Sequence, residues 1–231
     1  MKTFLLFILM LYVHAASASV IMVGTRVIVP SAAKEKTVQF NNPDPQPFIV
    51  EIKLSDEHDH SFQVPFVAVP PVFRIEPHQG QSVRLIPTSA EQLLPRDRES
   101  VFYMNFTQIP ALKRSARNDN QLIIAVKSRV KVFYRPETLT GQQSEAFKSL
   151  RFSLNNGKVK VENPTGFYIS ISRALFVSHT HSVTLTDAVM LAPLSSMEWS
   201  PAERVASLRD GKIRITQVND YGAYVENTRN P

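Results

Sequence analysis

The sequence predicts an all-β protein built from two β-sandwich domains, and three observations support this prediction. Apolar and polar residues alternate with a period of two through most of the chain after residue 19, as expected for strands with one buried face. These segments recur about every ten residues and are separated by Pro- or Asn-rich breaks, which is typical of antiparallel sandwiches. Helical patterning is confined to a short segment at 145–150, where we expect at most a turn or two.

The N-terminus has the features of a secretory signal peptide. Lys2 supplies a positive charge, an apolar run covers 4–13, and Ala16-Ser17-Ala18 forms a small-residue cleavage site. The apolar run is shorter than the roughly 20 residues that a membrane-spanning helix needs. We therefore predict a signal peptide over 1–18, in preference to a buried N-terminal helix, and a soluble exported product.

Two series of strands follow, joined by a polar segment at 136–145 that contains the helix and strand breakers Pro136 and Gly141. We place the first domain at 19–136, a linker at 137–142 and the second domain at 143–231. The turn Asn155-Asn156-Gly157 predicts a hairpin at the start of the second series. The expected strands are 20–30, 36–42, 48–55, 81–87, 101–106 and the long run 121–136, then 150–156, 158–164, 166–176, 182–191 and 212–220.

Composition excludes some classes of protein. With 43% hydrophobic residues the chain is able to bury real cores, which argues against global disorder. The net charge of +6 raises nucleic acid as a partner, but the predicted export argues against it and favours an anionic group on a protein partner or on the cell envelope. The chain has no cysteine, so packing alone must stabilise the fold.

The motifs of common enzymes are missing. There is no cysteine nucleophile, no GxSxG, no HExxH and no Gly-rich phosphate loop, and the chain has seven glycines in all. A Ser-His-Asp triad assembled from distant residues has no local support. We therefore expect neither enzymatic activity nor a cofactor.

Three polar segments need a separate explanation. The pairs His58/His60 and His179/His181 place histidines at alternate positions, and with Asp56 and Asp59 a zinc site is chemically reasonable. Two ligands on one strand face make an incomplete site, so we interpret both pairs as solvated hairpin tips and expect no metal. The segment KRSARN (113–118) is either a grip for an anionic partner or, as we favour, a mobile charged loop.

The run QLIIAVKSRVKVFYRP (121–136) suits neither a core strand nor a solvent edge. Leu122, Ile124 and Val126 make one face apolar, and the opposite face begins apolar and then carries cations. Both faces of an edge strand cannot be core, so one stripe must face something outside its domain. Lys131 has the opposite parity to the stripe of Leu122 and should point to the other side, unless a β-bulge intervenes.

Six segments, in order, resemble the periplasmic chaperones of the chaperone–usher pilus pathway. They are GTRVIVP (24–30), PPVFRIEP (70–77), PRDRESVFYMNF (95–106), KVFYRP (131–136), VENPT (161–165) and VNDYG (218–222). The resemblance implies two immunoglobulin-like domains in a boomerang arrangement with a cleft between them. It also implies donor-strand complementation, in which the chaperone lends an edge strand to an incomplete pilus subunit.

The resemblance also implies site residues. Arg26 and Lys131 would hold the C-terminal carboxylate of the subunit, since charge-assisted hydrogen bonds to a carboxylate are strong. The donor strand would present Leu122, Ile124 and Val126. An ion triad between the domains would comprise Glu99, Arg135 and Asp220.

The resemblance therefore implies a non-enzymatic periplasmic chaperone that binds one fimbrial subunit and delivers it to an outer-membrane usher. Pairing of free molecules through the exposed strand is a further expectation, because a bare apolar edge promotes association. Two alternatives stay open: an exported adhesion or receptor module in which the long strand is a core strand, and an exported hydrolase or metal-binding protein that uses the histidines.

Overall fold

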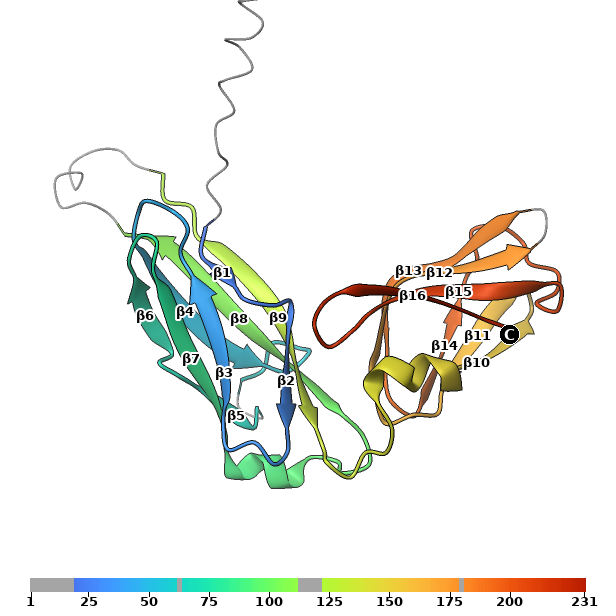
Figure 1. Cartoon of the computed structure of the whole chain (residues 1–231), viewed down its shortest axis with the longest axis horizontal. Helices are drawn as coiled ribbons and strands as arrows, with labels where there is room; N and C mark the ends of the chain where they lie inside the picture. Colours follow the sequence, from blue (N-terminus) through green and yellow to red (C-terminus); the bar gives the residue numbers. More distant parts are fainter. Residues whose placement is uncertain (1–18, 62–63, 112–121, 179–180) are drawn as a thin grey trace, which may run out of the picture.

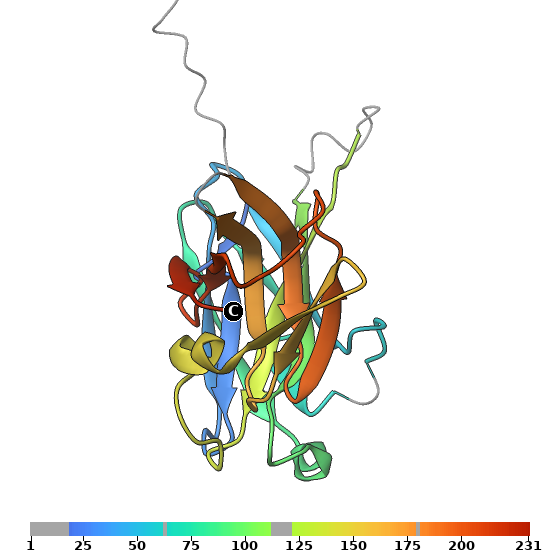
Figure 2. The ribbon, with the colours of Figure 1, turned by 90° about the vertical axis from the view of Figure 1, so that its right-hand side faces the viewer.

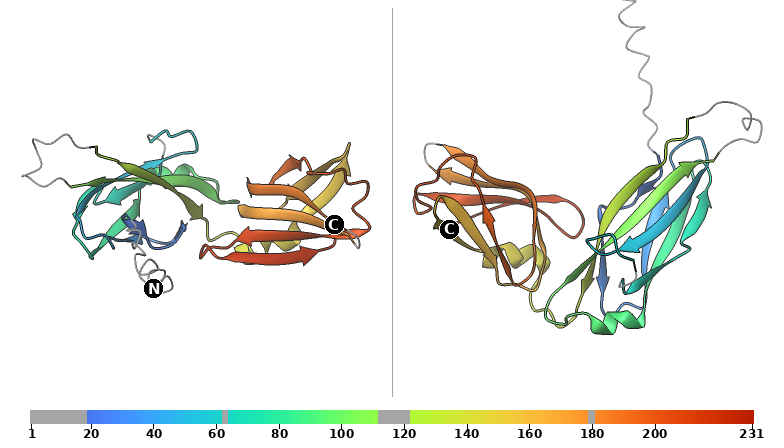
Figure 3. Two further views of the ribbon diagram at one scale, coloured as in Figure 1. Left: turned by 90° about the horizontal axis from the view of Figure 1, so that it is seen from above. Right: turned by 180° about the vertical axis from the view of Figure 1, so that it is seen from behind.

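The computed structural model describes residues 19–231 except 62–63, 112–121 and 179–180. Two β-sandwiches follow one another along the chain and meet at an angle, so that the molecule is V-shaped (Figure 1). Figure 2 looks onto the second sandwich with the first behind it, and Figure 3 shows both from above and from behind. The predicted signal peptide and the segment 113–118 lie outside the described residues.

The elements follow in chain order, with η denoting a 3-10 helix. They are β1 (Ile21–Met22), β2 (Arg26–Pro30), β3 (Lys36–Asn41), β4 (Phe48–Ser55), β5 (Phe66–Val69), β6 (Val72–Ile75), β7 (Gly80–Pro87), η1 (Ser89–Leu93), β8 (Ser100–Pro110), β9 (Val126–Arg135), η3 (Gln143–Ser149), β10 (Arg151–Asn155), β11 (Lys158–Asn163), β12 (Ile169–Ser178), β13 (Ser182–Leu191), β14 (Ser195–Trp199), β15 (Gly211–Val218) and β16 (Tyr224–Arg229). The predicted all-β class is confirmed, and the short helical segment is η3.

The first sandwich packs a sheet of order β1-β3-β7-β5 against a sheet of order β2-β9-β8-β4-β6. Its core includes the fully buried side chains of Phe40, Leu85 and Met104. The ring of Phe40 lies 5.7 Å from that of Phe73 and 5.2 Å from that of Phe106, centroid to centroid, which is the range in which aromatic pairs attract. Since the chain has no cysteine, this packing carries the stability of the domain.

The segment 20–30, which the sequence predicts as one strand, is divided between the two sheets. β1 pairs antiparallel with β3 in one sheet, whereas β2 pairs parallel with β9 in the other. Val20, Val27 and Val29 are nevertheless buried in the same core. A strand that changes sheets at a corner keeps its apolar side on the core between them, and this is why an unbroken apolar pattern conceals the division.

The second sandwich packs a sheet of order β10-β11-β14 against a sheet of order β13-β12-β15-β16. Isoleucines at 169, 171, 213 and 215 are among its buried core residues. The predicted hairpin is confirmed: β10 and β11 are joined through Asn156 and Gly157, both with positive φ, as a two-residue hairpin turn requires. The chain after Asp220 forms β16, which completes the sheet beside β15.

Candidate functional site

Arg26 and Lys131 lie on neighbouring strands of the first sandwich. They are register partners in the parallel pair β2–β9, so both side chains leave the same face of the sheet. Burial, and then the charge of Arg26, lower the pKa of Lys131, and burial likewise lowers the pKa of Arg26. Over the described part of the chain the Lys131 ammonium makes no hydrogen bond or ion pair. Two partly buried like charges side by side favour an anion between them.

The Arg26 guanidinium reaches the second domain. Its Nη1 donates to the carbonyl oxygen of Val218 at 3.1 Å and to Oγ of Ser170 at 3.3 Å. Arg26 also lines an open pocket of about 420 Å³ to which Asp220 and Tyr221 of the second domain contribute. The pair of cations therefore sits where the two sandwiches face each other.

A pair of aromatic rings lies beside Arg26. Phe133 is buried and its ring lies 5.7 Å from the ring of Tyr168 in the second domain. The guanidinium of Arg26 lies 5.9 Å from the centroid of Phe133, and burial raises the pKa of the Tyr168 phenol. The Phe133 ring displaces water from Arg26, which strengthens electrostatic attraction to an anion bound there.

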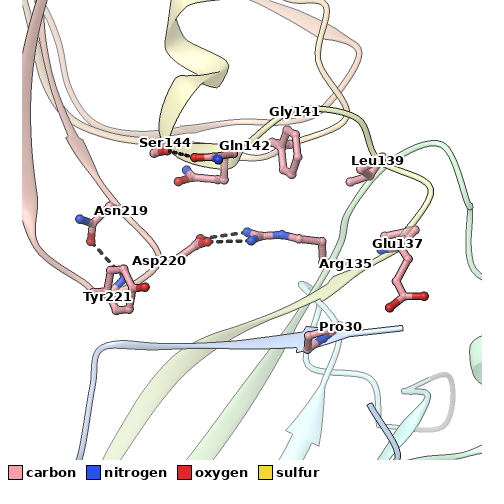
Figure 4. A pocket seen from close by; sticks show the side chains of 13 residues that line it. Pro30, Arg135, Glu137, Leu139, Gly141, Gln142, Ser144, Asn219, Asp220 and Tyr221 are labelled. Atoms are coloured by element: carbon pink, nitrogen blue, oxygen red, sulfur yellow. Dashed lines mark hydrogen bonds and ion pairs between the residues drawn. The ribbon is translucent and has the colours of Figure 1, made fainter. Parts of the chain in front are cut away.

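The three residues predicted for the ion triad meet between the domains. Arg135, the last residue of β9, donates from Nε to Glu99 at 2.6 Å and from Nη1 and Nη2 to Asp220 at 2.7 and 2.9 Å. Figure 4 shows the two contacts between Arg135 and Asp220. The other carboxylate oxygen of Glu99 accepts the backbone N–H of Tyr168 at 2.7 Å. Burial raises the pKa of Glu99, although the nearby charge of Arg135 opposes the rise.

A pocket of about 430 Å³ adjoins the triad at the point where the chain passes from one domain to the other. Pro30, Arg135, Leu139 and Tyr221 contribute to its walls (Figure 4). Its lining comes from both sandwiches and from the linker, so its shape depends on the angle between the domains.

The segment predicted to carry the donor stripe is exposed. Leu122, Ile124 and Val126 expose 87%, 65% and 43% of their surface. The prediction of a continuous strand through this segment is wrong for the free chain, because β9 begins only at Val126. β8 extends to Pro110, but its last residue that pairs with β9 is Gln108, so the segment 122–125 is not paired with β8.

No bulge separates the apolar stripe from Lys131. The register between β8 and β9 is unbroken from Val126 to Tyr134. Val130, Val132 and Tyr134 pack on the first core, and Lys131 has the opposite parity. The side chain of Lys131 therefore points away from that core. This is the arrangement without a β-bulge, which is one of the two alternatives that the sequence allows.

The histidines do not assemble a metal site in the described part of the chain. Residues 19–231, apart from the three gaps, contain no group of three His, Cys, Asp or Glu side chains placed to hold a metal ion. His60 instead lies 3.1 Å from Asp56, Nδ1 to Oδ2. In the same residues no helix is long and apolar enough to span a membrane.

The sequence prediction missed the contribution of the second domain to this site. Ser170 and the carbonyl of Val218 hold Arg26, and Gly222 approaches the β1–β2 connection so closely that a Cβ there would lie 2.2 Å from Oγ1 of Thr25. Val218 and Gly222 lie within the motif VNDYG (218–222), and this motif was the one signal in the sequence that pointed toward these contacts. Contacts made by a serine hydroxyl and a backbone carbonyl cannot be recognised from a sequence pattern.

The fold and the site together define a class: a two-domain sandwich protein with a cationic pair between its domains and an exposed apolar extension beside it. Residues 19–140 match the family described as "Pili and flagellar-assembly chaperone, PapD N-terminal domain", and residues 145–229 match "Pili assembly chaperone PapD, C-terminal domain". The chain belongs to this family of pilus-assembly chaperones. The family consists of chaperones and not of enzymes, so the expected function class is confirmed.

Similar proteins cover nearly the whole chain. The probable fimbrial chaperone YadV of Escherichia coli K12 is 33% identical over 227 residues, which is 94% of this chain and 92% of YadV. Chaperone protein MrkB of Klebsiella pneumoniae is 34% identical over 233 residues, with 97% of both chains covered. The crystal structure of YadV superposes with a TM-score of 0.79 at 31% identity, covering 93% of this chain and 100% of that one.

Proposed function

We propose that this protein is a periplasmic chaperone that binds one fimbrial subunit at a time, completes its fold by donor-strand complementation and delivers it to an outer-membrane usher. The observation that carries the proposal is the juxtaposition of an exposed apolar segment, 122–126, with an open strand edge that ends at two cations. Family membership supports the same reading. The exposed stripe disfavours the alternative in which the long strand is an ordinary core strand.

The open edge supports a definite geometry for the bound subunit. β9 pairs with β8 from Val126 to Tyr134, but with β2 only from Lys131 to Arg135. A subunit strand that added to the free edge of β9 would therefore meet β2 at its first residue, Arg26. A strand running parallel to β9 would end there, with its terminal carboxylate between Arg26 and Lys131. This anchor would set the register, which strand pairing alone specifies poorly.

The apolar stripe would supply much of the binding free energy. Leu122, Ile124 and Val126 have one parity and are exposed in the free chain. Burying each of them in the groove of a subunit would contribute roughly 1.5–3 kcal/mol. Strand formation over 122–125 would follow from the hydrogen bonds that the subunit supplies.

Two details of the proposal concern the whole chain. We place the signal peptide at 1–18 and the domains at 19–136 and 143–231, with the linker at 137–142. In the absence of a subunit, the exposed stripe would pair two chaperone molecules edge to edge. Sedimentation at increasing protein concentration would detect such pairs, and a strictly monomeric protein at all concentrations would contradict them.

The carboxylate anchor is tested by co-expressing the protein with a pilus subunit encoded in the same genome. We expect the wild type to yield a soluble one-to-one complex, and Arg26→Ala or Lys131→Ala to reduce its yield at least about tenfold, because each removes a charge-assisted contact. Lys127→Ala is the matched control, since Lys127 is an exposed cation on the same face of β9. Undiminished complex with both cleft variants would refute the anchor.

A further inference from the structure

We infer that the second domain orients the carboxylate anchor, and that Ser170 is its positioning residue. This inference rests on the proposed role of Arg26 and extends it: the first domain supplies the positive charge, and the second domain determines where that charge points.

The contacts of the Arg26 guanidinium are uneven. Nη1 makes both hydrogen bonds to the second domain, to Val218 and Ser170, residues 192 and 144 positions away in the chain. Nε is buried without a partner, and Nη2 makes no hydrogen bond with the described residues. Because the guanidinium is planar and rigid, fixing Nη1 also fixes the direction of Nη2. The guanidinium is therefore fixed through Nη1, and Nη2 is available to donate to a ligand.

Ser170 is placed for this task by β12. Ser170 is 6% exposed, and its hydroxyl oxygen accepts from Arg26 across the domain boundary. Tyr168, two residues earlier, donates its backbone N–H to Glu99 of the ion triad. The chain at the start of β12 therefore contacts both Arg26 of the anchor and Glu99 of the triad. These two contacts fix the position of β12 relative to β2.

The turn after β15 connects the anchor to the triad a second time. The carbonyl of Val218 accepts from Arg26, and Asp220, two residues later, binds Arg135. Arg26 and Arg135 lie on the paired strands β2 and β9. One short segment of the second domain thus holds two arginines of the first, and a change in the angle between the domains would reorient the anchor.

The test measures how fast a chaperone–subunit complex dissociates, by exchange of the subunit into an excess of labelled wild-type chaperone. The probe is the co-expressed pilus subunit, prepared with its natural C-terminal carboxylate and with a C-terminal carboxamide. We expect Ser170→Ala to accelerate dissociation of the carboxylate form about three- to tenfold, which corresponds to the net contribution of one typical intramolecular hydrogen bond. Dissociation of the carboxamide form should not change.

Ser172→Ala is the matched control, because Ser172 lies on the same strand, is less buried, and has a hydroxyl that makes no hydrogen bond with the described residues. It should leave both rates unchanged. In an Arg26→Ala background, Ser170→Ala should have no further effect, since the group that it positions is gone. A purely structural role for Ser170 would accelerate both subunit forms and would persist without Arg26; either result overturns the inference. If Arg26→Ala itself leaves the rate unchanged, the proposed anchor fails instead, which is a separate and recognisable outcome.

Discussion

Lys131 is held in an unfavourable electrostatic state in the free protein. Its ammonium is partly buried and lies beside the guanidinium of Arg26, and burial together with that charge lowers its pKa. A bound carboxylate would offset both effects on the pKa of Lys131, because an opposite charge at close range favours the protonated amine. Subunit binding and protonation of Lys131 are therefore coupled.

This coupling predicts how binding depends on pH. The pKa of Lys131 is below its ordinary value in the free protein and should rise when the carboxylate binds. Its contribution to affinity is then complete below the free-state pKa and is lost as the pH rises through the higher pKa of the complex. We expect the dissociation constant of the complex to be constant near neutral pH and to increase under alkaline conditions.

Lys131→Arg provides the control for this pH dependence. A guanidinium stays charged throughout the range in which an amine titrates, so the alkaline weakening should disappear in the variant. Binding measured by fluorescence titration across the alkaline range would check both proteins. An identical pH profile for the two would show that another group is responsible.

The two faces of β9 contact different parts of the molecule, and the segment that precedes β9 is exposed. Residues of even number, from Val130 to Tyr134, pack on the first core, whereas Lys131, Phe133 and Arg135 face the second domain or the site between the domains. Ahead of the strand, the exposed segment 122–125 continues the same alternation without a partner. β9 thus joins a paired part, which anchors it, to an exposed part with which a subunit would pair under the proposed function.

Mutagenesis tests which of the two alternating sets of side chains in the segment 122–125 enters the subunit. Ile124→Ser should weaken subunit binding by more than about tenfold, because a side chain that would be buried in the subunit contributes about 1.5–3 kcal/mol. Ile123→Ser is the matched control, as Ile123 is also exposed but lies on the opposite parity. Neither change should lower the melting temperature of the free chaperone. Equal loss of binding in both variants would contradict insertion of a single stripe.

At the level of the whole molecule, the ion triad joins the two domains. Glu99 is almost fully buried and accepts from both Arg135 and the backbone of Tyr168. Its raised pKa reflects the free energy needed to bury a carboxylate, so we expect the triad to do more to specify the angle between the domains than to stabilise them. Removing one member still leaves buried donors without an acceptor, which is costly.

Glu99→Ala should therefore destabilise the protein by about 3 kcal/mol and widen the range of angles between the domains. Chemical denaturation would measure the first effect and small-angle X-ray scattering the second. Asp97→Ala is the control: Asp97 forms an exposed ion pair with Arg98 nearby in the same loop, and exposed pairs contribute about 0–1 kcal/mol. An unchanged scattering curve for Glu99→Ala would show that the triad does not set the angle.

Local patterns were sufficient to predict much of the architecture. Alternation of apolar residues identified nearly all of the longer strands, and Asn156-Gly157 identified a hairpin, because both depend only on neighbours in sequence. The motifs in order pointed to the family, and the residues expected to form the triad lie together. The division of 20–30 into β1 and β2, and the start of β9 at Val126, were not predictable in this way, since each depends on which partner strand is present.

The sequence by itself determined two β-sandwiches and an apolar stripe at 122–126 that an edge strand cannot bury within its own domain. It also indicated two cations, Arg26 and Lys131, as candidates for a site near that stripe. Only the tertiary structure decided that Arg26 stands beside Lys131, that Ser170 and Val218 hold its guanidinium from the other domain, and that Gly222 closes against Thr25. The physical reason is that these contacts join residues far apart in the chain. They form only when two separately folded domains meet at one particular angle.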